Sequence, residues 1–174
     1  MSFIVEHSIV IKRSLIPVWH AWIDLPQWPR WHTGLLDAFW LTPELWWKKE
    51  SQFVLVWRGK FPLNRYKVRC SVTSVEPGKS ITWRAKGIGL KATRGYRFSE
   101  VSGGTQVTAF GKFTGLAAVL LRPLVRAHIN TRLTQALAGL AQFVEREVPA
   151  EAPKVERVVV PPEWLSTGKK HMPF

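Results

Sequence analysis

Apolar residues recur along the chain with two different periods, and the shorter one covers most of it. Seven stretches are rich in β-branched and aromatic residues and are typical of half-buried strands. Turn-forming sequences, namely GKFPLN, EPGK, KGIG and SGGT, separate the later stretches at short spacing, as an antiparallel meander requires. The pattern predicts strands near residues 3–12, 35–41, 52–58, 66–75, 80–86, 91–100 and 105–113.

An amphipathic helix is predicted directly after the first strand. Ser14 belongs to the residue types that cap helix N-termini. Apolar residues at helical spacing follow it: Leu15, Val18, Trp19, Trp22 and Ile23. The next segment, DLPQWPRWH, has two prolines and an Asp that can cap a helix, so it predicts a second, short helical turn.

A long helix is predicted near the end of the chain, where the apolar period changes to 3.6 residues after Gly115. Pro123 is expected to kink or restart this helix, because proline lacks the N–H that a helix interior needs. The apolar stripe consists of Leu121, Val125, Ile129, Leu133, Leu137, Leu140 and Val144.

These elements together favour one fold class. A single helix cannot bury its apolar stripe alone, and a seven-stranded sheet needs one face covered. We therefore expect an α+β helix-grip fold, in which a curved antiparallel sheet wraps around the long C-terminal helix and two short helices follow the first strand. The domain is expected to span residues 1–148, and residues 149–174 form a Pro-containing tail whose role stays open.

Composition supports a folded domain without a metal or disulfide. The 174 residues are 46% hydrophobic and include ten Trp, which is far from the composition of a disordered chain. Only one Cys is present, and neither CxxC nor HExxH occurs. The start, MSFIVEHSIVIKRS, lacks the features of a signal peptide, and no apolar run is long enough to span a membrane. We expect a cytoplasmic protein with no cofactor.

The net charge of +13 is concentrated in the middle of the chain. Residues 51–100 contain eleven Lys and Arg but only two acidic residues. Strand parity places several cations on the outer face of the sheet. A solvated surface is one interpretation, and peripheral contact with an anionic membrane or an acidic protein is another. Nucleic acid ranks last, since no groove-reading helix or aromatic motif accompanies the charge. The outer-face residues are Arg58, Lys67, Arg69, Arg84, Lys86 and Arg97.

Several segments resemble a known superfamily. They are VWHAWIDLPQWPRW, the turn VEPGKSITW, and the hairpin YRFSEVSGGTQVT leading into FGKFTG. With the order of predicted elements, residues 3–146 resemble the START and birch-pollen-allergen-like (SRPBCC) superfamily in its polyketide cyclase/dehydrase branch. Ser51 is a mild departure, since relatives often have Gly before the third strand. The resemblance implies a cavity between sheet and helix that takes a lipid, sterol, polyketide or isoprenoid, but does not say which.

Side-chain alternation predicts which residues face such a cavity. Close packing in a solid core is the alternative interpretation for the same residues, and inward-facing Val72, Ile81 and Ala85 share it. Cys70 is expected to behave as a small buried hydrophobe. The candidate ligand-binding residues are Trp31, Phe53, Leu55, Trp57, Tyr66, Val68, Cys70, Trp83, Arg94, Tyr96, Phe98, Leu121, Val125 and His128.

Arg94 stands out among these candidates because its parity sends a guanidinium group toward an apolar interior. A buried cation is costly unless it is paired. Arg94 must therefore reach the edge of the domain, pair with an acidic residue, or bind an anionic ligand group such as a carboxylate or phosphate. Trp46 and Trp47 pose a similar constraint: being adjacent, both cannot face the core of a strand, so at least one should be exposed.

Three functions remain open from the sequence. The first is a binding protein that sequesters or transports an apolar small molecule. The second is an aromatase/cyclase-like enzyme without metal or nucleophile, in which Tyr66, Arg94 or His128 polarises a carbonyl. The third is an interaction module without a ligand, acting through the basic face and the tail. No spacing of Ser or Cys with His and Asp argues for nucleophilic catalysis, so the catalytic residues stay unknown.

Overall fold

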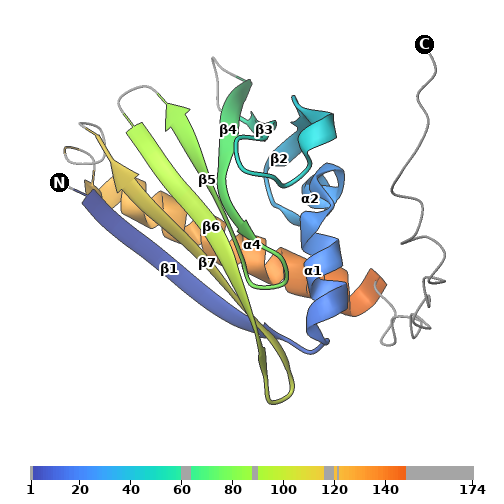
Figure 1. Ribbon diagram of the computed structural model, residues 1–174. Coiled ribbons are helices and arrows are strands. Elements are labelled where there is room, and N and C mark those ends of the chain that lie inside the picture. The colour runs from blue at the N-terminus through green and yellow to red at the C-terminus, as the bar shows by residue number, and fades with distance from the viewer. Residues whose placement is uncertain (1, 60–63, 88–89, 116–119, 121, 148–174) are drawn as a thin grey trace, which may run out of the picture.

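The protein forms one antiparallel sheet with helices on a single side (Figure 1). The computed structural model describes residues 2–59, 64–87, 90–115, 120 and 122–147. The sheet has seven strands in the order β1-β7-β6-β5-β4-β3-β2, and all neighbours are antiparallel. The strands are β1 (Ser2–Ile11), β2 (Leu35–Trp40), β3 (Gln52–Arg58), β4 (Arg65–Glu76), β5 (Ser80–Gly87), β6 (Leu90–Val101) and β7 (Gly104–Thr114).

The helices also occupy the predicted places. After β1 come α1 (Leu15–Ile23), the 3₁₀ turn η1 (Leu25–Gln27) and α2 (Trp28–Trp31). A further 3₁₀ turn, η2 (Pro43–Leu45), which the sequence pattern did not predict, connects β2 and β3. The long helix α4 (Arg122–Glu147) ends the described part of the chain. The helix-grip α+β class is therefore confirmed.

The local predictions hold with small differences. The bounds of β3 agree with the predicted range, and the other strands differ from theirs by one residue at one or both ends. Ser14 does occupy the N-cap of α1, but its side chain makes no capping hydrogen bond there. Pro123 lies in the first turn of α4, where its missing N–H costs little, so the helix begins beside it rather than kinking at it.

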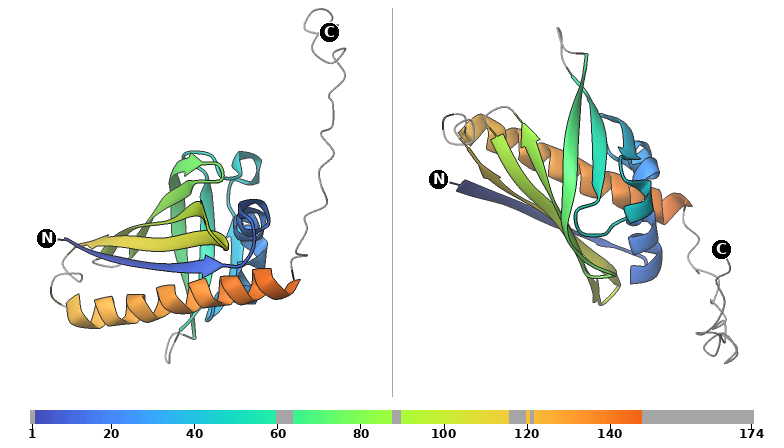
Figure 2. Two further views of the ribbon diagram at one scale, coloured as in Figure 1. Left: turned by 90° about the horizontal axis from the view of Figure 1, so that it is seen from below. Right: turned by 45° about the horizontal axis from the view of Figure 1, so that its top comes forward.

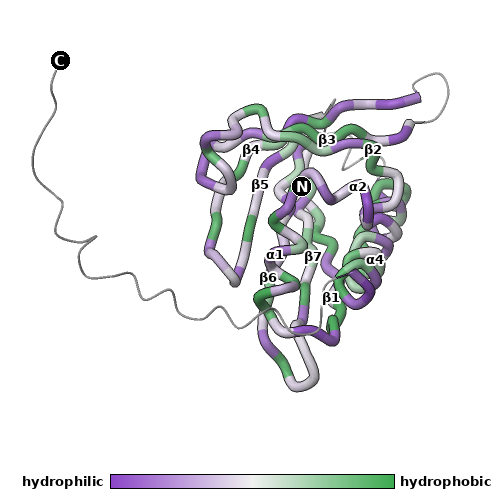
Figure 3. Tube along the Cα trace, turned by 90° about the vertical axis from the view of Figure 1, so that its right-hand side faces the viewer, coloured by the Kyte–Doolittle hydropathy of each residue, from purple (hydrophilic) through white to green (hydrophobic). Residues whose placement is uncertain are grey.

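Helix α4 runs the length of the sheet next to β1 and contacts α1 and α2 (Figure 2). Its tube in Figure 3 carries both hydrophobic and hydrophilic residues, as expected of an amphipathic helix. Leu133, Leu137 and Leu140 are buried against the core. Gly139 permits a very close approach: a Cβ atom there would lie 1.9 Å from the carbonyl oxygen of Trp31. This contact sets how deeply α4 sits on α2.

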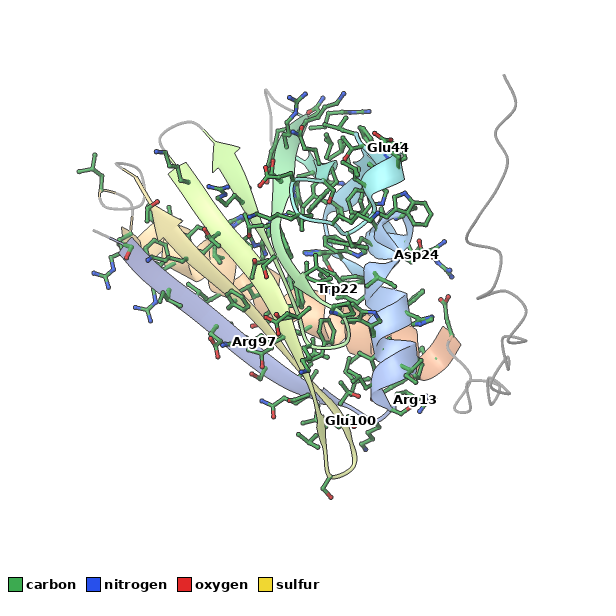
Figure 4. The ribbon with its side chains drawn as sticks, in the orientation of Figure 1. Arg13, Trp22, Asp24, Glu44, Arg97 and Glu100 are labelled. Carbon is green, nitrogen blue, oxygen red and sulfur yellow. The ribbon has the colours of Figure 1, made fainter. Side chains whose placement is uncertain are left out.

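One end of the interior is filled by a cluster of aromatic rings. Trp22, labelled in Figure 4, is fully buried and lies at its centre. Its ring centroid is 5.0 Å from that of Trp28 and 5.0 Å from that of Tyr96. Further members of the aromatic cluster are Trp19, Trp31, Trp40, Trp47, Phe53, Trp83 and Phe98. These rings come from α1, α2, the segment after η2 and four strands, and they pack against one another at this end.

The adjacent tryptophans after η2 behave as predicted. Trp46 is 64% exposed, whereas Trp47 joins the aromatic cluster. The indole Nε1–H of Trp47 donates a hydrogen bond of 2.6 Å to the carbonyl oxygen of Ile23. Trp47 has a φ of 45°, a left-handed conformation that is rare for a bulky residue. Backbone strain there is offset by the packing and by the hydrogen bond of its side chain.

Candidate ligand-binding cavity

A cavity of about 460 Å³ lies at the other end of the interior, between strands β3 to β7 and helix α4. Its volume falls in the range of small-molecule sites, roughly 300–1,000 Å³. Most of its wall is apolar. The described residues that line it are Leu55, Trp57, Tyr66, Lys67, Val68, Cys70, Trp83, Ala85, Ala92, Arg94, Phe113, His128, Ile129 and Arg132.

The strand register explains how these side chains come together. Leu55 on β3 is opposite Val68 on β4, and Cys70 on β4 is opposite Ala85 on β5. Ala85 in turn is opposite Ala92 on β6. Small residues at adjacent positions of neighbouring strands leave space that larger side chains would fill. The cavity therefore lies over the strand positions with the smallest inward-facing side chains.

The predicted ligand-binding residues divide into two groups. Leu55, Trp57, Tyr66, Val68, Cys70, Trp83, Arg94 and His128 line the cavity. Four others, Trp31, Phe53, Tyr96 and Phe98, face inward but belong to the aromatic cluster. Val125 is half-buried on α4 outside the cavity wall, and Leu121 lies outside the described residues.

The sequence pattern missed several lining residues. Ala92 and Phe113 are opposite each other on β6 and β7; on β6 only Arg94, Tyr96 and Phe98 were considered, and on β7 no residue was. Ile129 was expected in the helix stripe, but not at the cavity. Arg132 was not considered, because it is polar and stands next to Leu133 of the stripe. Lys67, expected on the outer face, is exposed and also lines the cavity mouth beside Tyr66.

Arg94 enters the cavity from β6. It is opposite Trp83 on β5 and Gly111 on β7, and a Cβ atom at Gly111 would lie 3.7 Å from the Cγ atom of Arg94. The side chain is half-buried. Among the described residues it forms no ion pair or side-chain hydrogen bond. Arg94 thus neither pairs with an acidic residue of the described chain nor lies fully in solvent.

Arg132 enters the same cavity from α4, across from the sheet. The Cζ atom of its guanidinium group is 4.5 Å from the ring centroid of Trp57, a distance typical of a cation–π contact. Its Nε–H donates a hydrogen bond of 3.1 Å to Nε2 of His128, one helical turn earlier. Its Nη1 atom is buried and has no hydrogen-bond partner in the described structure. The guanidinium group is therefore held in place by Trp57 and His128 but not neutralised.

His32 lies behind this end of the cavity and stays neutral. Its ring packs edge-on against Trp57 at 4.9 Å and stacks on Trp31 at 5.5 Å. The pKa of His32 is lowered to about 3, chiefly by burial and additionally by the positive charges of Arg94 and Arg132. Its Nδ1 atom is buried without a hydrogen-bond partner among the described residues. The two arginines must therefore lie close enough to His32 to act on it electrostatically.

Two further titratable groups of the interior are also neutral. Burial raises the pKa of the Cys70 thiol to about 12, although the charge of Arg94 opposes this shift. Burial likewise raises the pKa of Tyr96 to about 12. Because a thiolate is the reactive form of cysteine, Cys70 is a poor nucleophile at neutral pH.

Most of the cations expected on the outer face of the sheet are exposed. Arg58, Lys67, Arg69, Arg84 and Arg97 are exposed, whereas the side chain of Lys86 lies outside the described structure. Arg97, labelled in Figure 4, pairs with Glu6 at 2.5 Å. The face is therefore not free of acidic residues: β1 and β6, which are not neighbours in the sheet, bring this ion pair together across β7.

The described residues contain neither a candidate metal site nor a helix that could span a membrane. No three His, Cys, Asp or Glu side chains are close enough to one another to hold a metal ion in this part of the chain. No helix among the described ranges has the length and apolarity that crossing a membrane requires.

Solved structures with the same fold include bacterial aromatase/cyclases. The Zhui aromatase/cyclase from Streptomyces sp. R1128 is 15% identical with a TM-score of 0.70, and the match covers 86% of this chain and 98% of that one. The di-domain ARO/CYC StfQ from the steffimycin biosynthetic pathway is 14% identical with a TM-score of 0.68. That match covers 83% of this chain but only 51% of StfQ, so the chain spans about half the length of StfQ.

A protein from Deinococcus radiodurans is also similar, with 20% identity, a TM-score of 0.58, and coverage of 82% of this chain and 95% of that one. At such identities these structures show a shared fold only. No curated protein matches the sequence. The family described as polyketide cyclase / dehydrase and lipid transport matches residues 2–145, which include every described strand and nearly all of α4. The chain belongs to this polyketide cyclase/dehydrase and lipid transport family.

Proposed function

We propose that the protein binds an apolar or amphipathic small molecule in its internal cavity and sequesters or transports it. The observation that carries this proposal is the cavity of about 460 Å³ with mostly apolar walls. The cavity opens to solvent beside the exposed side chains of Tyr66 and His128. A bound ligand would remove its apolar wall from water, which is favourable in proportion to the apolar area buried.

The chemistry of the cavity wall favours binding over catalysis. None of the described lining residues is acidic, so no carboxylate is available there as a general acid or base. The thiol of Cys70 is neutral, as its raised pKa of about 12 shows. Nε2 of His128 accepts a hydrogen bond from the Nε–H of Arg132. A carrier needs only the shape and the apolar wall.

An aromatase/cyclase-like activity is the second candidate. The observation in its favour is the presence of two guanidinium groups, of Arg94 and Arg132, in the same cavity. Such groups can polarise the carbonyl oxygens of a polyketone chain and stabilise the enolate that forms during ring closure. The similarity of fold to the Zhui aromatase/cyclase is consistent with this candidate. A module that binds no ligand has less support, because a packed interior would suit it better.

Native mass spectrometry of the protein purified from its own host, followed by extraction, tests the proposal. We expect a co-purifying apolar molecule in the wild type and its loss in Ala92→Phe, which places a ring in the cavity. Thr93→Phe is the matched control, because the neighbouring residue on β6 does not line the cavity. Recovery of a chemically altered, cyclised product from a supplied polyketone would favour the enzyme.

A direct binding assay decides the case where no ligand co-purifies. The neutral, apolar dye N-phenyl-naphthylamine should bind the wild type saturably with increased fluorescence, and Ala92→Phe should reduce this binding. If the wild type shows no saturable binding of the dye, or if Ala92→Phe binds it as well as the wild type does, the cavity is not a binding site and the proposal fails.

A further inference from the structure

The two arginines of the cavity belong to opposite walls and lie toward the same end, where both act electrostatically on His32. Arg94 comes from β6 in the sheet and Arg132 from α4, which covers it. Trp57 connects Arg132 to His32: the guanidinium group lies over the Trp57 ring, and the imidazole ring packs against Trp57 at a steep angle. Both arginines act electrostatically on His32. Their positive charges are therefore concentrated around the Trp57 end of the cavity.

Nothing in the described structure neutralises this end. Among the described residues, the ion pairs are Arg30 with Glu147 and Arg97 with Glu6. Both pairs are exposed, and none of their residues lines the cavity. The lining residues include Lys67 as a third cation and no acidic residue. A partly buried guanidinium group without a partner is costly, and a second one in the same cavity raises that cost through repulsion. The two guanidinium groups therefore lack a compensating negative charge among the described residues.

Guanidinium N–H groups of both arginines also lack hydrogen-bond acceptors among the described residues. Nη1 of Arg132 is buried and donates to no described atom, and Arg94 forms no side-chain hydrogen bond. Trp57 and His128 fix the orientation of the Arg132 guanidinium group, which reduces the entropy that binding would cost. Neutral His32 adds no acceptor charge of its own and keeps a buried Nδ1 atom without a partner. An oxyanion is the group that would accept several of these donors at once.

The rest of the cavity is suited to a hydrocarbon. Away from the arginines its wall consists of aliphatic, aromatic and small side chains: Leu55, Val68, Cys70, Ala85, Phe113 and Ile129. An apolar chain in contact with these residues would gain roughly 0.8 kcal/mol for each buried CH₂ group. The cavity thus has a cationic end and an apolar end.

We propose that the cavity selects amphipathic acids, binding a carboxylate or phosphate-monoester head group between Arg94 and Arg132 and the hydrocarbon tail against the apolar wall. This inference rests on the proposed function and narrows its ligand class. A neutral lipid or sterol would leave both guanidinium groups without a partner, so it would bind less tightly than an acid of the same tail.

Ligands that share a tail and differ in their head group test the inference. Decanoate, decyl phosphate, decanol and decylamine would each compete with N-phenyl-naphthylamine for the full-length protein. Decanoate or decyl phosphate should bind at least about tenfold more tightly than decanol, as expected for a charge-assisted hydrogen bond in a partly buried site. Decylamine should bind more weakly than decanol. Whichever of decanoate and decyl phosphate binds more tightly carries the head group that the arginines prefer.

Two variants and a control assign the effect to the arginines. Arg94→Met and Arg132→Met keep most of the length of the side chain and remove its charge. Each should weaken binding of the preferred acid by about tenfold or more, while the affinity for decanol stays within about twofold of the wild type. Arg69→Met removes one cation from the exposed outer face and should change neither. Because decanol binding needs the folded cavity, it also reports whether each variant folds.

The outcomes separate this inference from the proposed function. If decanol binds the wild type as tightly as both acids do, or if neither arginine variant weakens the acids, the head-group site is refuted and an unselective apolar cavity remains. If none of the four ligands displaces the dye and the dye itself does not bind saturably, the proposed function fails, and the inference fails with it.

Discussion

Acidification should destabilise this fold through one buried side chain, His32. The pKa of His32 is lowered from 6.5 to about 3 in the folded protein, mainly by burial. In the unfolded chain the imidazole takes up a proton below its ordinary pKa, whereas in the folded protein it stays neutral until the pH approaches 3. The unfolded state therefore binds more protons over this interval, and the free energy of unfolding falls as the pH decreases from 6.5 toward 3.

The size of this effect follows from the linkage between protonation and folding. A single group with such a difference contributes about 1.4 kcal/mol for each pH unit within the interval. Between about pH 6.5 and about pH 4.5 the loss should reach roughly 2 kcal/mol, because the unfolded imidazole is only half protonated at its pKa. This is a substantial part of the stability of a typical domain, about 5–15 kcal/mol. Above the ordinary pKa of the imidazole, His32 should make no difference to the pH dependence.

Urea unfolding at a series of pH values measures this slope. The control for other titrating groups is the difference between the wild type and His32→Gln, which cannot take up a proton and should show a flatter dependence below the ordinary pKa of histidine. His20→Gln, at an exposed position on α1, should keep the slope of the wild type. If the wild type and His32→Gln lose the same free energy of unfolding between about pH 6.5 and about pH 4.5, the pKa of His32 is not lowered and the reasoning is refuted.

Two further changes test other parts of the structure. Gly139→Ala should lower the free energy of unfolding by roughly 1–3 kcal/mol, measured by thermal unfolding, although Ala has the higher helix propensity. The reason is that its Cβ atom would lie 1.9 Å from the Trp31 carbonyl oxygen. The control Gln142→Ala, at an exposed position of the same helix, should change the free energy of unfolding by about 0.5 kcal/mol or less. A stable Gly139→Ala protein would contradict the close packing of α4 on α2. The reactivity of Cys70 is the second test. Iodoacetamide, followed by mass spectrometry, should alkylate Cys70 at least about a thousandfold more slowly in the native protein than in urea. This difference is expected because the thiol is buried and its pKa is raised to about 12 in the folded protein. Rapid native alkylation would mean that the thiol is accessible or ionised.

Local pattern predicted most of the fold because the physical causes of the elements are local. The period of two and the turn sequences between strands depend on neighbouring residues, so β3 (Gln52–Arg58) agrees with its predicted range. Leu133, Leu137 and Leu140 are buried as their helical spacing indicated. Adjacency alone required one of Trp46 and Trp47 to be exposed, and Trp46 is.

Contacts between distant segments decided the remaining features of the surface and the core. Glu6 and Arg97 are far apart in the sequence, and only the order of strands in the sheet brings them into an ion pair. Inward-facing Phe53 and Tyr96 followed the predicted parity but pack into the aromatic cluster. Parity states which face of the sheet a side chain lies on, but not whether a neighbour from another element already fills the space beside it.

The chain's own pattern thus determined a seven-stranded helix-grip domain and the inward direction of Arg94, because alternation and helical period are properties of consecutive residues. The tertiary structure alone decided where the interior is hollow, since an empty volume depends on the rings that α1 and α2 insert at one end and on the small residues, such as Ala85 and Ala92, that meet at the other. It also decided that Arg132 joins Arg94, because only the packing of α4 over the sheet brings the two guanidinium groups to one end of the cavity.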